Sequence, residues 1–177
     1  MSFLEQARTV YAQLKARRNG RVESPVVPLP RYAVNAVNAE SPPAYLRVND
    51  RAGRDMVAAA LDSTVLVGLD LETTGLDPRT DRVRLRSLAC DTIDGGTFAY
   101  LVDGFAVDPR PLLAALAEKH LVIHNGAFDL AFLAQLGFTP AGKVHDTMLL
   151  AQLLTAGTNE RITLAACCER WLVRPLD

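Results

Sequence analysis

Residues 65–76 read Val-Leu-Val-Gly-Leu-Asp-Leu-Glu-Thr-Thr-Gly-Leu, an apolar run that closes on two carboxylates, Asp70 and Glu72. Successive side chains of a β-strand point to opposite faces, so these two acids share one face while Leu69 and Leu71 point to the other. Two like charges side by side repel each other, and a cation relieves that cost. Mg²⁺ or Mn²⁺, hard ions that prefer oxygen ligands, are the expected cations. The stretch therefore predicts a buried strand that carries two metal ligands.

The length and composition of the chain indicate the class of protein to which this strand belongs. The chain has 177 residues, 49% hydrophobic and 22% charged, which suits one well-buried domain plus an appendage. Its apolar stretches are shorter than the roughly 20 residues of a membrane span, and charged residues interrupt the first 20 positions. We therefore expect an intracellular, cytoplasmic protein without a membrane partner. Cys90, Cys167 and Cys168 lack Cys-x-x-Cys spacing and are predicted to be buried thiols.

The N-terminal segment differs in charge from the rest of the chain. Residues 1–31 hold six basic and two acidic residues, whereas the remainder holds 13 basic and 18 acidic residues. Apolar residues at helical spacing predict an amphipathic helix in residues 1–20, and five prolines predict an extended linker over 21–43. The helix could dock a protein partner, touch nucleic acid with its basic end, or fold back on the body.

From residue 44 onward, strand and helix patterns alternate. A strand, a helix and the carboxylate strand are followed by two strands joined across Asp94-Gly95-Gly96, and then by helix, strand and helices. This order predicts an α/β fold in which an antiparallel three-stranded meander and parallel strands form one mixed sheet covered by helices. The expected strands cover 45–48, 64–72, 82–90, 97–102 and 121–124, and the expected helices cover 50–61, 109–119, 126–136, 146–154 and 163–172.

A second motif, His-Asn-Gly-Ala-Phe-Asp-Leu-Ala-Phe-Leu over 124–133, follows a short apolar strand. Asp129 falls in the first turn of the next helix. Phe128, Phe132 and Leu136 share one face of that helix and are expected to anchor it to the sheet. Asp129 then projects near the strand ends, where ligands of open α/β sheets bind.

Taken together, Asp-x-Glu-Thr-Thr-Gly-Leu and Asn-x-x-Phe-Asp resemble, in order and spacing, the first two motifs of the DEDD superfamily of 3′–5′ exonucleases. The run from His145 to Leu154, with Leu164 and residues 168–172, is similar to the proofreading domains of family A DNA polymerases (DNA polymerase I-like) and less closely to ribonuclease D. The resemblance covers residues 45–177 and implies a ribonuclease H-like fold.

The resemblance implies hydrolysis of phosphodiester bonds at the 3′ end of single-stranded DNA, with release of nucleoside monophosphates. Two Mg²⁺ or Mn²⁺ ions would clamp the attacking water and the leaving 3′ oxygen. It assigns catalysis and metal binding to Asp70, Glu72 and Asp129, and contact with the substrate to Thr73, Leu76, Asn125 and Phe128.

The family's fourth carboxylate lies in a third motif, Tyr-x-x-x-Asp or His-x-x-x-x-Asp, and this sequence offers it only as His124 and Asp129, where the Asp already belongs to the second motif. We therefore expect a C-terminally incomplete domain over 44–177: a natural truncation, an excised piece or half of a split enzyme. Another protein, a missing C-terminal segment or a polymerase would complete it. The chain alone is expected to bind metal and to show weak or no exonuclease activity.

Other interpretations stay open. The chain could trim RNA as ribonuclease D does, or act as a non-catalytic nucleic-acid-binding or partner-docking module. Asp70 and Glu72 could instead pair with Arg79 and Arg82. Asp146 is expected to cap a helix rather than bind metal. His124 and His145 are expected to be structural, and Arg82, Arg84 and Arg86 to form a basic row that is either a solvated face or a phosphate track.

Overall fold

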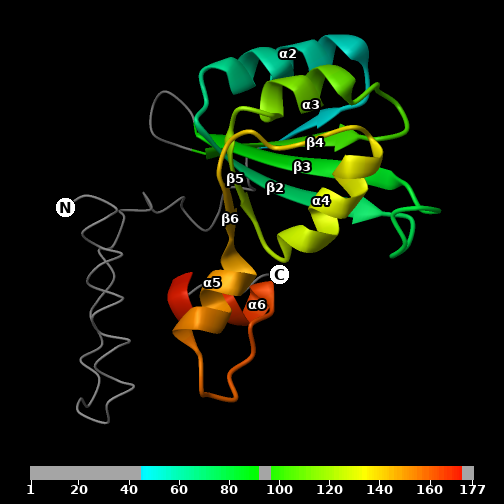
Figure 1. Ribbon diagram of the computed structural model, residues 1–177. Helices are drawn as coiled ribbons and strands as arrows, with labels where there is room; N and C mark the ends of the chain where they lie inside the picture. The colour runs from blue at the N-terminus through cyan, green and yellow to red at the C-terminus, as the bar shows by residue number, and fades with distance from the viewer. Residues whose placement is uncertain (1–44, 92–96, 173–177) are drawn as a thin grey trace. The chain divides into compact units, whose positions relative to one another are not determined.

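The computed structural model describes residues 45–91 and 97–172 (Figure 1). The expected N-terminal helix, the linker and the turn at 94–96 lie outside the described residues. Six strands are described: β1 (Tyr45–Val48), β2 (Leu66–Thr73), β3 (Val83–Asp91), β4 (Thr97–Asp103), β5 (His120–Ile123) and β6 (Val144–Asp146). The helices are α2 (Arg51–Asp62), α3 (Arg110–Leu116), α4 (Gly126–Gln135), α5 (Thr147–Leu154), α6 (Leu164–Cys167) and the π-helical turn η1 (Cys168–Leu172).

The strands form one mixed sheet in the order β1-β4-β3-β2-β5-β6. Strand β3 pairs antiparallel with β2 and β4, and these three strands are the expected meander. Strand β1 pairs parallel with β4, β5 pairs parallel with β2, and β6 pairs parallel with β5. The predicted fold class, a mixed α/β sheet covered by helices, is therefore confirmed.

Most expected boundaries lie within two residues of the observed ones, but one strand and the end of one helix depart further from the prediction. Strand β6 was not expected, because three residues are too few to show an alternating pattern. Helix α3 ends at Leu116 rather than near Lys119, and β5 starts at His120, because Lys119 N–H already closes a turn on the carbonyl of Leu116.

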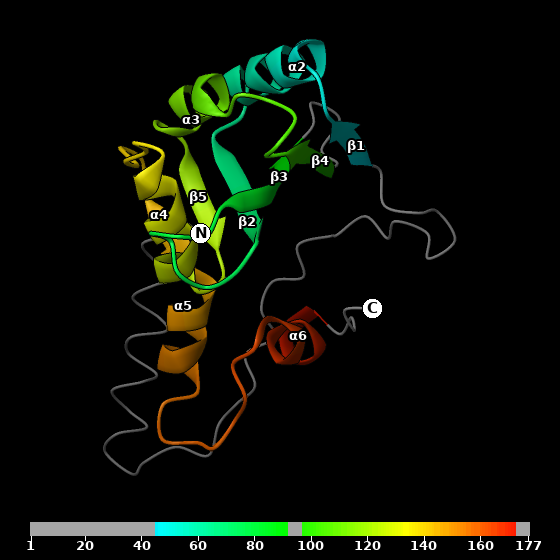
Figure 2. The same ribbon diagram turned by 90° about the vertical axis from the view of Figure 1, so that its right-hand side faces the viewer.

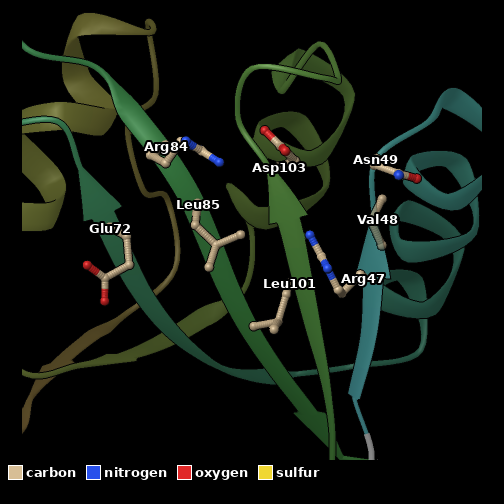
Figure 3. Close-up of a pocket in the computed structure, with 8 residues that line it drawn as sticks. All are labelled: Arg47, Val48, Asn49, Glu72, Arg84, Leu85, Leu101 and Asp103. Carbon is tan, nitrogen blue, oxygen red and sulfur yellow. The ribbon is translucent and has the colours of Figure 1, made fainter.

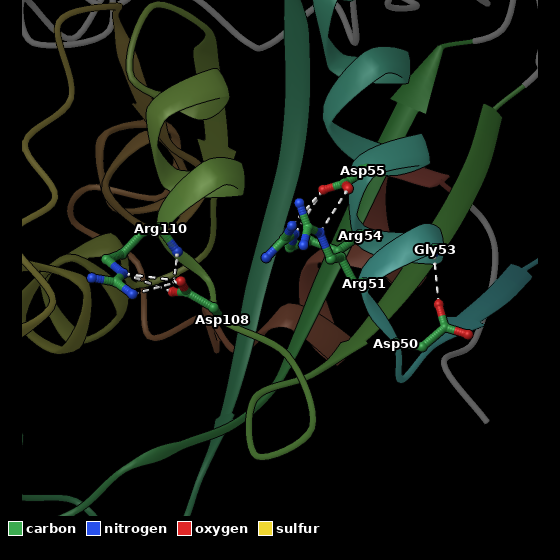
Figure 4. Close-up of polar contacts among 7 residues, drawn as sticks. All are labelled: Asp50, Arg51, Gly53, Arg54, Asp55, Asp108 and Arg110. Carbon is green, nitrogen blue, oxygen red and sulfur yellow. Dashed lines mark hydrogen bonds and ion pairs between the residues drawn. The ribbon is translucent and has the colours of Figure 1, made fainter.

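Side-chain caps explain where several helices begin. Asp50 Oδ1 accepts a hydrogen bond from Gly53 N at 2.7 Å and so caps α2 (Figure 4). Asp108 pairs with Arg110 at 2.8 Å beside the start of α3. Thr163 caps α6 through Ala166 N. These short-range contacts involve neighbours in the chain, which is why most helix starts were predictable.

The hydrophobic core lies on one face of the sheet. Figure 2 shows α2, α3 and α4 on the same side of the strands, and their buried side chains pack against the sheet. Phe132 of α4 is buried as expected, but Leu136 is 40% exposed and does not anchor the helix; Leu133 is buried instead. All three cysteines are buried, as predicted. The sheet residues in this core include Val67, Leu69, Leu71, Leu88, Cys90, Val102, Leu121 and Ile123.

The opposite face of the sheet carries Asp70 and Glu72, both exposed, together with the half-buried Leu85 and Leu101. We call this surface the open face. The expected basic row does not form, because Arg86 points into the core and is 2% exposed, whereas Arg82 and Arg84 are exposed. Among the described helices, none has the length and apolar character needed to cross a membrane.

Candidate active site

Asp70 and Glu72 lie on the open face because β2 alternates along its length. The flanking leucines, Leu69 and Leu71, are buried in the core, so the two acids between and after them must face outward. Across the β2–β3 ladder Asp70 lies opposite Ser87 and Glu72 lies opposite Leu85. The alternative pairing with Arg79 is not formed, since that arginine binds Asp77 at 2.8 Å.

Asp129 reaches β2 from a segment 58 residues away. The parallel pairing of β2 with β5 stops at Gly68 and Val122, so the next backbone N–H groups on that edge of β2 need other partners. Asp129, in the first turn of α4, accepts a hydrogen bond from Leu71 N on its Oδ1 atom at 3.1 Å. The hydrogen bond places Asp129 against the segment of β2 that lies between Asp70 and Glu72.

The electrostatics of Asp129 and Asp70 are coupled. Burial raises the pKa of Asp129 to about 6, and the negative charge of Asp70 adds to the shift, while hydrogen bonds from backbone N–H groups oppose it. Although Asp70 is exposed, the protein around its carboxylate displaces enough water to raise its pKa, and His124 opposes that shift. A cation bound near both carboxylates would favour their charged forms.

The donor set suits a hard divalent ion, because all three candidate ligands are carboxylates. Within residues 45–91 and 97–172, however, no three Asp, Glu, His or Cys side chains are already grouped as a metal site. The structure brings Asp129 and Asp70 together, whereas Glu72 lines a hollow of the open face. The joint role of the three acids in holding metal thus stays a prediction.

Asp146 holds in place the start of α4, the helix that carries Asp129. Its carboxylate accepts hydrogen bonds from Gly126 N at 2.8 Å, Met148 N at 2.9 Å, and Asn125 N and Leu149 N at 3.2 Å. Burial acts against ionisation, but these four N–H groups outweigh it and lower the pKa of Asp146. Its expected role as a cap is confirmed, and the same carboxylate also holds the start of α4.

His124 makes contacts that the sequence did not indicate. Its Nε2 atom donates to the carbonyl of Ile162 at 3.0 Å, and its Nδ1 atom lies 2.9 Å from the hydroxyl oxygen of Thr147. The ring therefore ties the end of β5 to the segment before α6. The separation of 38 positions between His124 and Ile162 left no local pattern from which to predict this contact.

Thr73 is the last residue of β2, and Leu76 lies in the turn that follows it. This turn is held by Thr74 N donating to Arg82 O at 2.9 Å and by Asp77 N donating to the Asp81 carboxylate at 2.9 Å. Leu76 is 83% exposed on it, the highest exposure among the large apolar side chains of the described residues. The Thr73 hydroxyl donates to Gly75 O at 2.6 Å and so belongs to the turn itself.

Asn125 and Phe128 lie at the start of α4. Asn125 adopts a left-handed conformation, with φ 67°, and its exposed side chain makes no capping hydrogen bond. Phe128 is half-buried and packs against Phe132, with ring centroids 5.0 Å apart. Contact of these residues with a substrate stays a prediction, as it does for Thr73 and Leu76.

Comparison with known proteins adds three findings. A family model described as 3′-5′ exonuclease matches residues 47–177. DNA polymerase I of Aquifex aeolicus is 31% identical over 108 residues, which make up 60% of this chain but 17% of that polymerase. The chain thus spans less than a fifth of the polymerase's length.

Solved structures with the same fold include Escherichia coli RNase D and Brucella melitensis NrnC. Escherichia coli RNase D, described as an exoribonuclease involved in structured RNA processing, matches with a TM-score of 0.61 at 23% identity over 75% of this chain and 34% of RNase D. Brucella melitensis NrnC bound to pGG matches with a TM-score of 0.57 at 25% identity, over 77% of this chain and 64% of NrnC. A further NrnC structure, 24% identical, contains bound Mg²⁺.

Proposed function

The chain belongs to the 3′-5′ exonuclease family whose model matches residues 47–177, and from this premise we propose that it hydrolyses phosphodiester bonds at the 3′ end of single-stranded nucleic acid. The observation that carries the proposal is the hydrogen bond between Asp129 and Leu71 N, because it joins the two sequence motifs at one point of β2. The raised pKa values of Asp70 and Asp129 support a cation at the same point.

Asp70, Glu72 and Asp129 would hold Mg²⁺ or Mn²⁺. Divalent ions at such a site activate the attacking water and stabilise the leaving 3′ oxygen of the scissile phosphate. Asp70 and Glu72 are exposed, so their side chains can turn toward an ion without disturbing the core. The hydrogen bond from Leu71 N holds one oxygen of Asp129 in place and leaves the other for the ion. The Mg²⁺ found with NrnC supports this choice of ion.

The turn after β2 and the start of α4 would position the 3′ end. Leu76 offers an apolar surface for the terminal base. Hydrogen bonds hold its turn in place, so the side chain stays exposed to solvent. The exposed amide of Asn125 is available to the strand, and Phe128 would support it from the helix. Thr73 contributes chiefly by holding the turn at Gly75.

DNA is our first choice of substrate, because of the likeness to DNA polymerase I of Aquifex aeolicus. RNA is the second candidate, and NrnC bound to pGG, at 25% identity, is the observation that favours it. We expect slow trimming by this chain alone in either case, because three carboxylates hold two ions less firmly than four and no Tyr-x-x-x-Asp motif is present to orient the water.

The test measures nucleotide release from 3′-labelled DNA and RNA strands of one sequence, with Mg²⁺ or Mn²⁺. We expect Asp70→Asn, Glu72→Gln and Asp129→Asn each to lower the rate at least about a hundredfold, because each removes a metal-binding charge. Asp62→Asn, an exposed acid at the end of α2, is the matched control and should trim at the wild-type rate.

Equal trimming by Asp70→Asn and Asp62→Asn would overturn the proposal. Oligonucleotide binding that survives Asp70→Asn, without turnover in either metal, would instead identify a non-catalytic binding module. The ratio of DNA to RNA rates decides between the two substrates.

A further inference from the structure

A hollow of about 430 Å³ lies on the open face beside Glu72, and the function proposed above gives it no role (Figure 3). This volume lies within the range of pockets that bind small ligands or single nucleotides. Leu85 and Leu101 lie between Glu72 and Arg47 in Figure 3. The charged groups at the hollow are Arg47, Arg84, Glu72 and Asp103.

Strand register explains why these residues meet. Glu72 of β2 lies opposite Leu85 of β3, which lies opposite Asp103 of β4, and Arg47 of β1 lies opposite Leu101. Residues opposite each other in a ladder share a face, so the hollow continues the surface that carries Asp70 and Glu72. Four strands at the usual spacing make this surface roughly 14 Å wide.

A β-bulge brings Arg84 to the hollow. The register between β2 and β3 shifts between Glu72 and Thr73, which lie opposite Leu85 and Val83, so Arg84 has no partner in the ladder. Val83 turns into the core, while both Arg84 and Leu85 line the hollow. The guanidinium of Arg84 lies 5.2 Å from the ring centroid of Phe105, a contact that restrains the side chain.

The two arginines keep their charge available for a ligand. Both are exposed, and the ion pairs among the described residues are made by other arginines. Asp103 lines the same hollow, but its carboxylate accepts a hydrogen bond from Phe105 N at 2.9 Å. Glu72 is assigned to metal in the proposed function. With Glu72 bound to metal, the charges left at the hollow are those of Arg47, Arg84 and Asp103, so an incoming ligand meets a net positive charge.

We propose that this hollow binds the sugar–phosphate backbone of the single-stranded nucleic acid whose 3′ end lies at Asp70, Glu72 and Asp129, an inference that rests on the proposed function. Arg47 and Arg84 contact phosphate oxygens of the nucleotides that precede the 3′ end. Leu85 and Leu101 form the apolar floor under the sugars. No base edge is read, so binding depends on charge and strand length rather than on base sequence.

The experiment measures binding of labelled oligonucleotides of about ten nucleotides, DNA and RNA, by fluorescence anisotropy in EDTA, which prevents hydrolysis. Salt is varied from about 50 to 200 mM, because removing one arginine–phosphate interaction reduces the slope of log K against log salt by about 0.7 for single strands. The variants are Arg47→Gln, Arg84→Gln and the charge-retaining Arg84→Lys. Arg51→Gln and Arg110→Gln, exposed arginines outside the hollow, are the matched controls.

We expect Arg47→Gln and Arg84→Gln each to weaken binding roughly three- to tenfold at low salt and to reduce the slope, equally for every base sequence. Arg84→Lys should retain most of the slope, and both controls should bind as wild type. In the trimming assay the Gln variants should raise KM and leave kcat nearly unchanged, since neither arginine touches the scissile bond.

Slopes that are the same for the hollow variants and the controls would overturn the proposal. If the wild-type protein nevertheless trims oligonucleotides and Asp70→Asn abolishes trimming, the proposed exonuclease activity stands, but the hollow does not bind the strand. If the salt slope depends on Arg47 and Arg84 but the protein never trims, the result supports binding at the hollow and contradicts the proposed exonuclease activity.

Discussion

Asp129 is a buried acid whose neighbourhood favours its neutral form in the metal-free protein. Its pKa rises to about 6, against about 3.9 for an unperturbed Asp. A raised folded-state pKa means that the folded chain binds the proton more tightly than the unfolded chain. The stability that this group contributes is therefore fully present below about pH 3.9, and it is lost as the pH rises through about 6.

Asp129→Asn should consequently stabilise the protein at neutral pH while abolishing activity. We expect the free energy of unfolding in EDTA to rise by roughly 1–3 kcal/mol at pH 7, because the neutral amide carries no buried charge. The amide oxygen can still accept the hydrogen bond from Leu71 N. Urea unfolding at pH 7 and pH 4 measures the effect, which should nearly vanish at pH 4. A destabilisation at pH 7 would contradict the argument.

Arg86 is a second buried charge, on the core face of β3. It is 2% exposed, and its Nε and Nη1 atoms have no hydrogen-bond partner among the described residues. Burial lowers the pKa of its guanidinium, as expected for a charge withdrawn from water. Nothing in the proposed chemistry uses this side chain, so its burial is a cost to stability.

Arg86→Met should raise the free energy of unfolding by about 1–3 kcal/mol, because methionine keeps an unbranched stem and removes the unpaired charge. Arg84→Met, at the exposed neighbouring site, is the control and should change stability by less than about 0.5 kcal/mol. Chemical denaturation of the two variants checks this. A loss of stability in Arg86→Met would show that the guanidinium has a partner beyond the described residues.

Among the helices and strands, α4 and α5 depend on the short strand β6. Asp146 ends β6, and its carboxylate accepts backbone N–H groups from the starts of both helices. Because α4 carries Asp129, loosening this connection should also move Asp129 away from Leu71. Asp50 offers a comparison, since its side chain caps α2 through Gly53.

Asp146→Ala is expected to lower the free energy of unfolding by roughly 2–3 kcal/mol, since it leaves four backbone N–H groups without their acceptor. Asp50→Ala should cost about 1 kcal/mol. Calorimetric titration with Mn²⁺ separates the two roles: Asp146→Ala should bind the ion more weakly than wild type, while Asp50→Ala should bind it normally. Equal affinities would mean that Asp146 does not position Asp129.

For the domain as a whole, one face of the sheet supplies stability and the other is left for function. Helices α2, α3 and α4 cover the core face, whereas the open face concentrates carboxylates and the hollow. Partial burial of the carboxylates raises the pKa of Asp70 and of Asp129, and the charge of Asp70 adds to the shift of Asp129, so ionising this pair costs free energy. A divalent ion that binds the folded chain should offset that cost.

Mg²⁺ or Mn²⁺ should therefore raise the melting temperature of the protein. At a concentration about one hundred times Kd the stabilisation is about 2.7 kcal/mol, which corresponds to roughly 5–10 °C for a chain of this size. Differential scanning calorimetry in EDTA and in each metal measures the shift. Asp70→Asn should abolish most of it, whereas the exposed control Asp62→Asn should retain it. The same shift in both variants would place the ion elsewhere.

Much of the architecture follows from patterns within about ten residues. Alternation along β2 predicts that Asp70 and Glu72 share a face, and the cap residues Asp50 and Asp146 mark helix starts. These features are readable because backbone geometry imposes periods of about two and 3.6 on any chain, whatever packs against it. The order and spacing of the two acidic motifs likewise indicate the family from the sequence alone.

Other features exist only once distant segments meet. Four features have no signal in the nearby sequence. They are the β-bulge beside Glu72, the burial of Arg86, the three-residue strand β6 and the contact of His124 with Ile162. Each depends on which strand lies beside which, and on where a ladder stops. The hydrogen bond from Leu71 to Asp129 forms because the pairing with β5 stops before β2 itself ends, leaving a backbone N–H that the buried carboxylate satisfies.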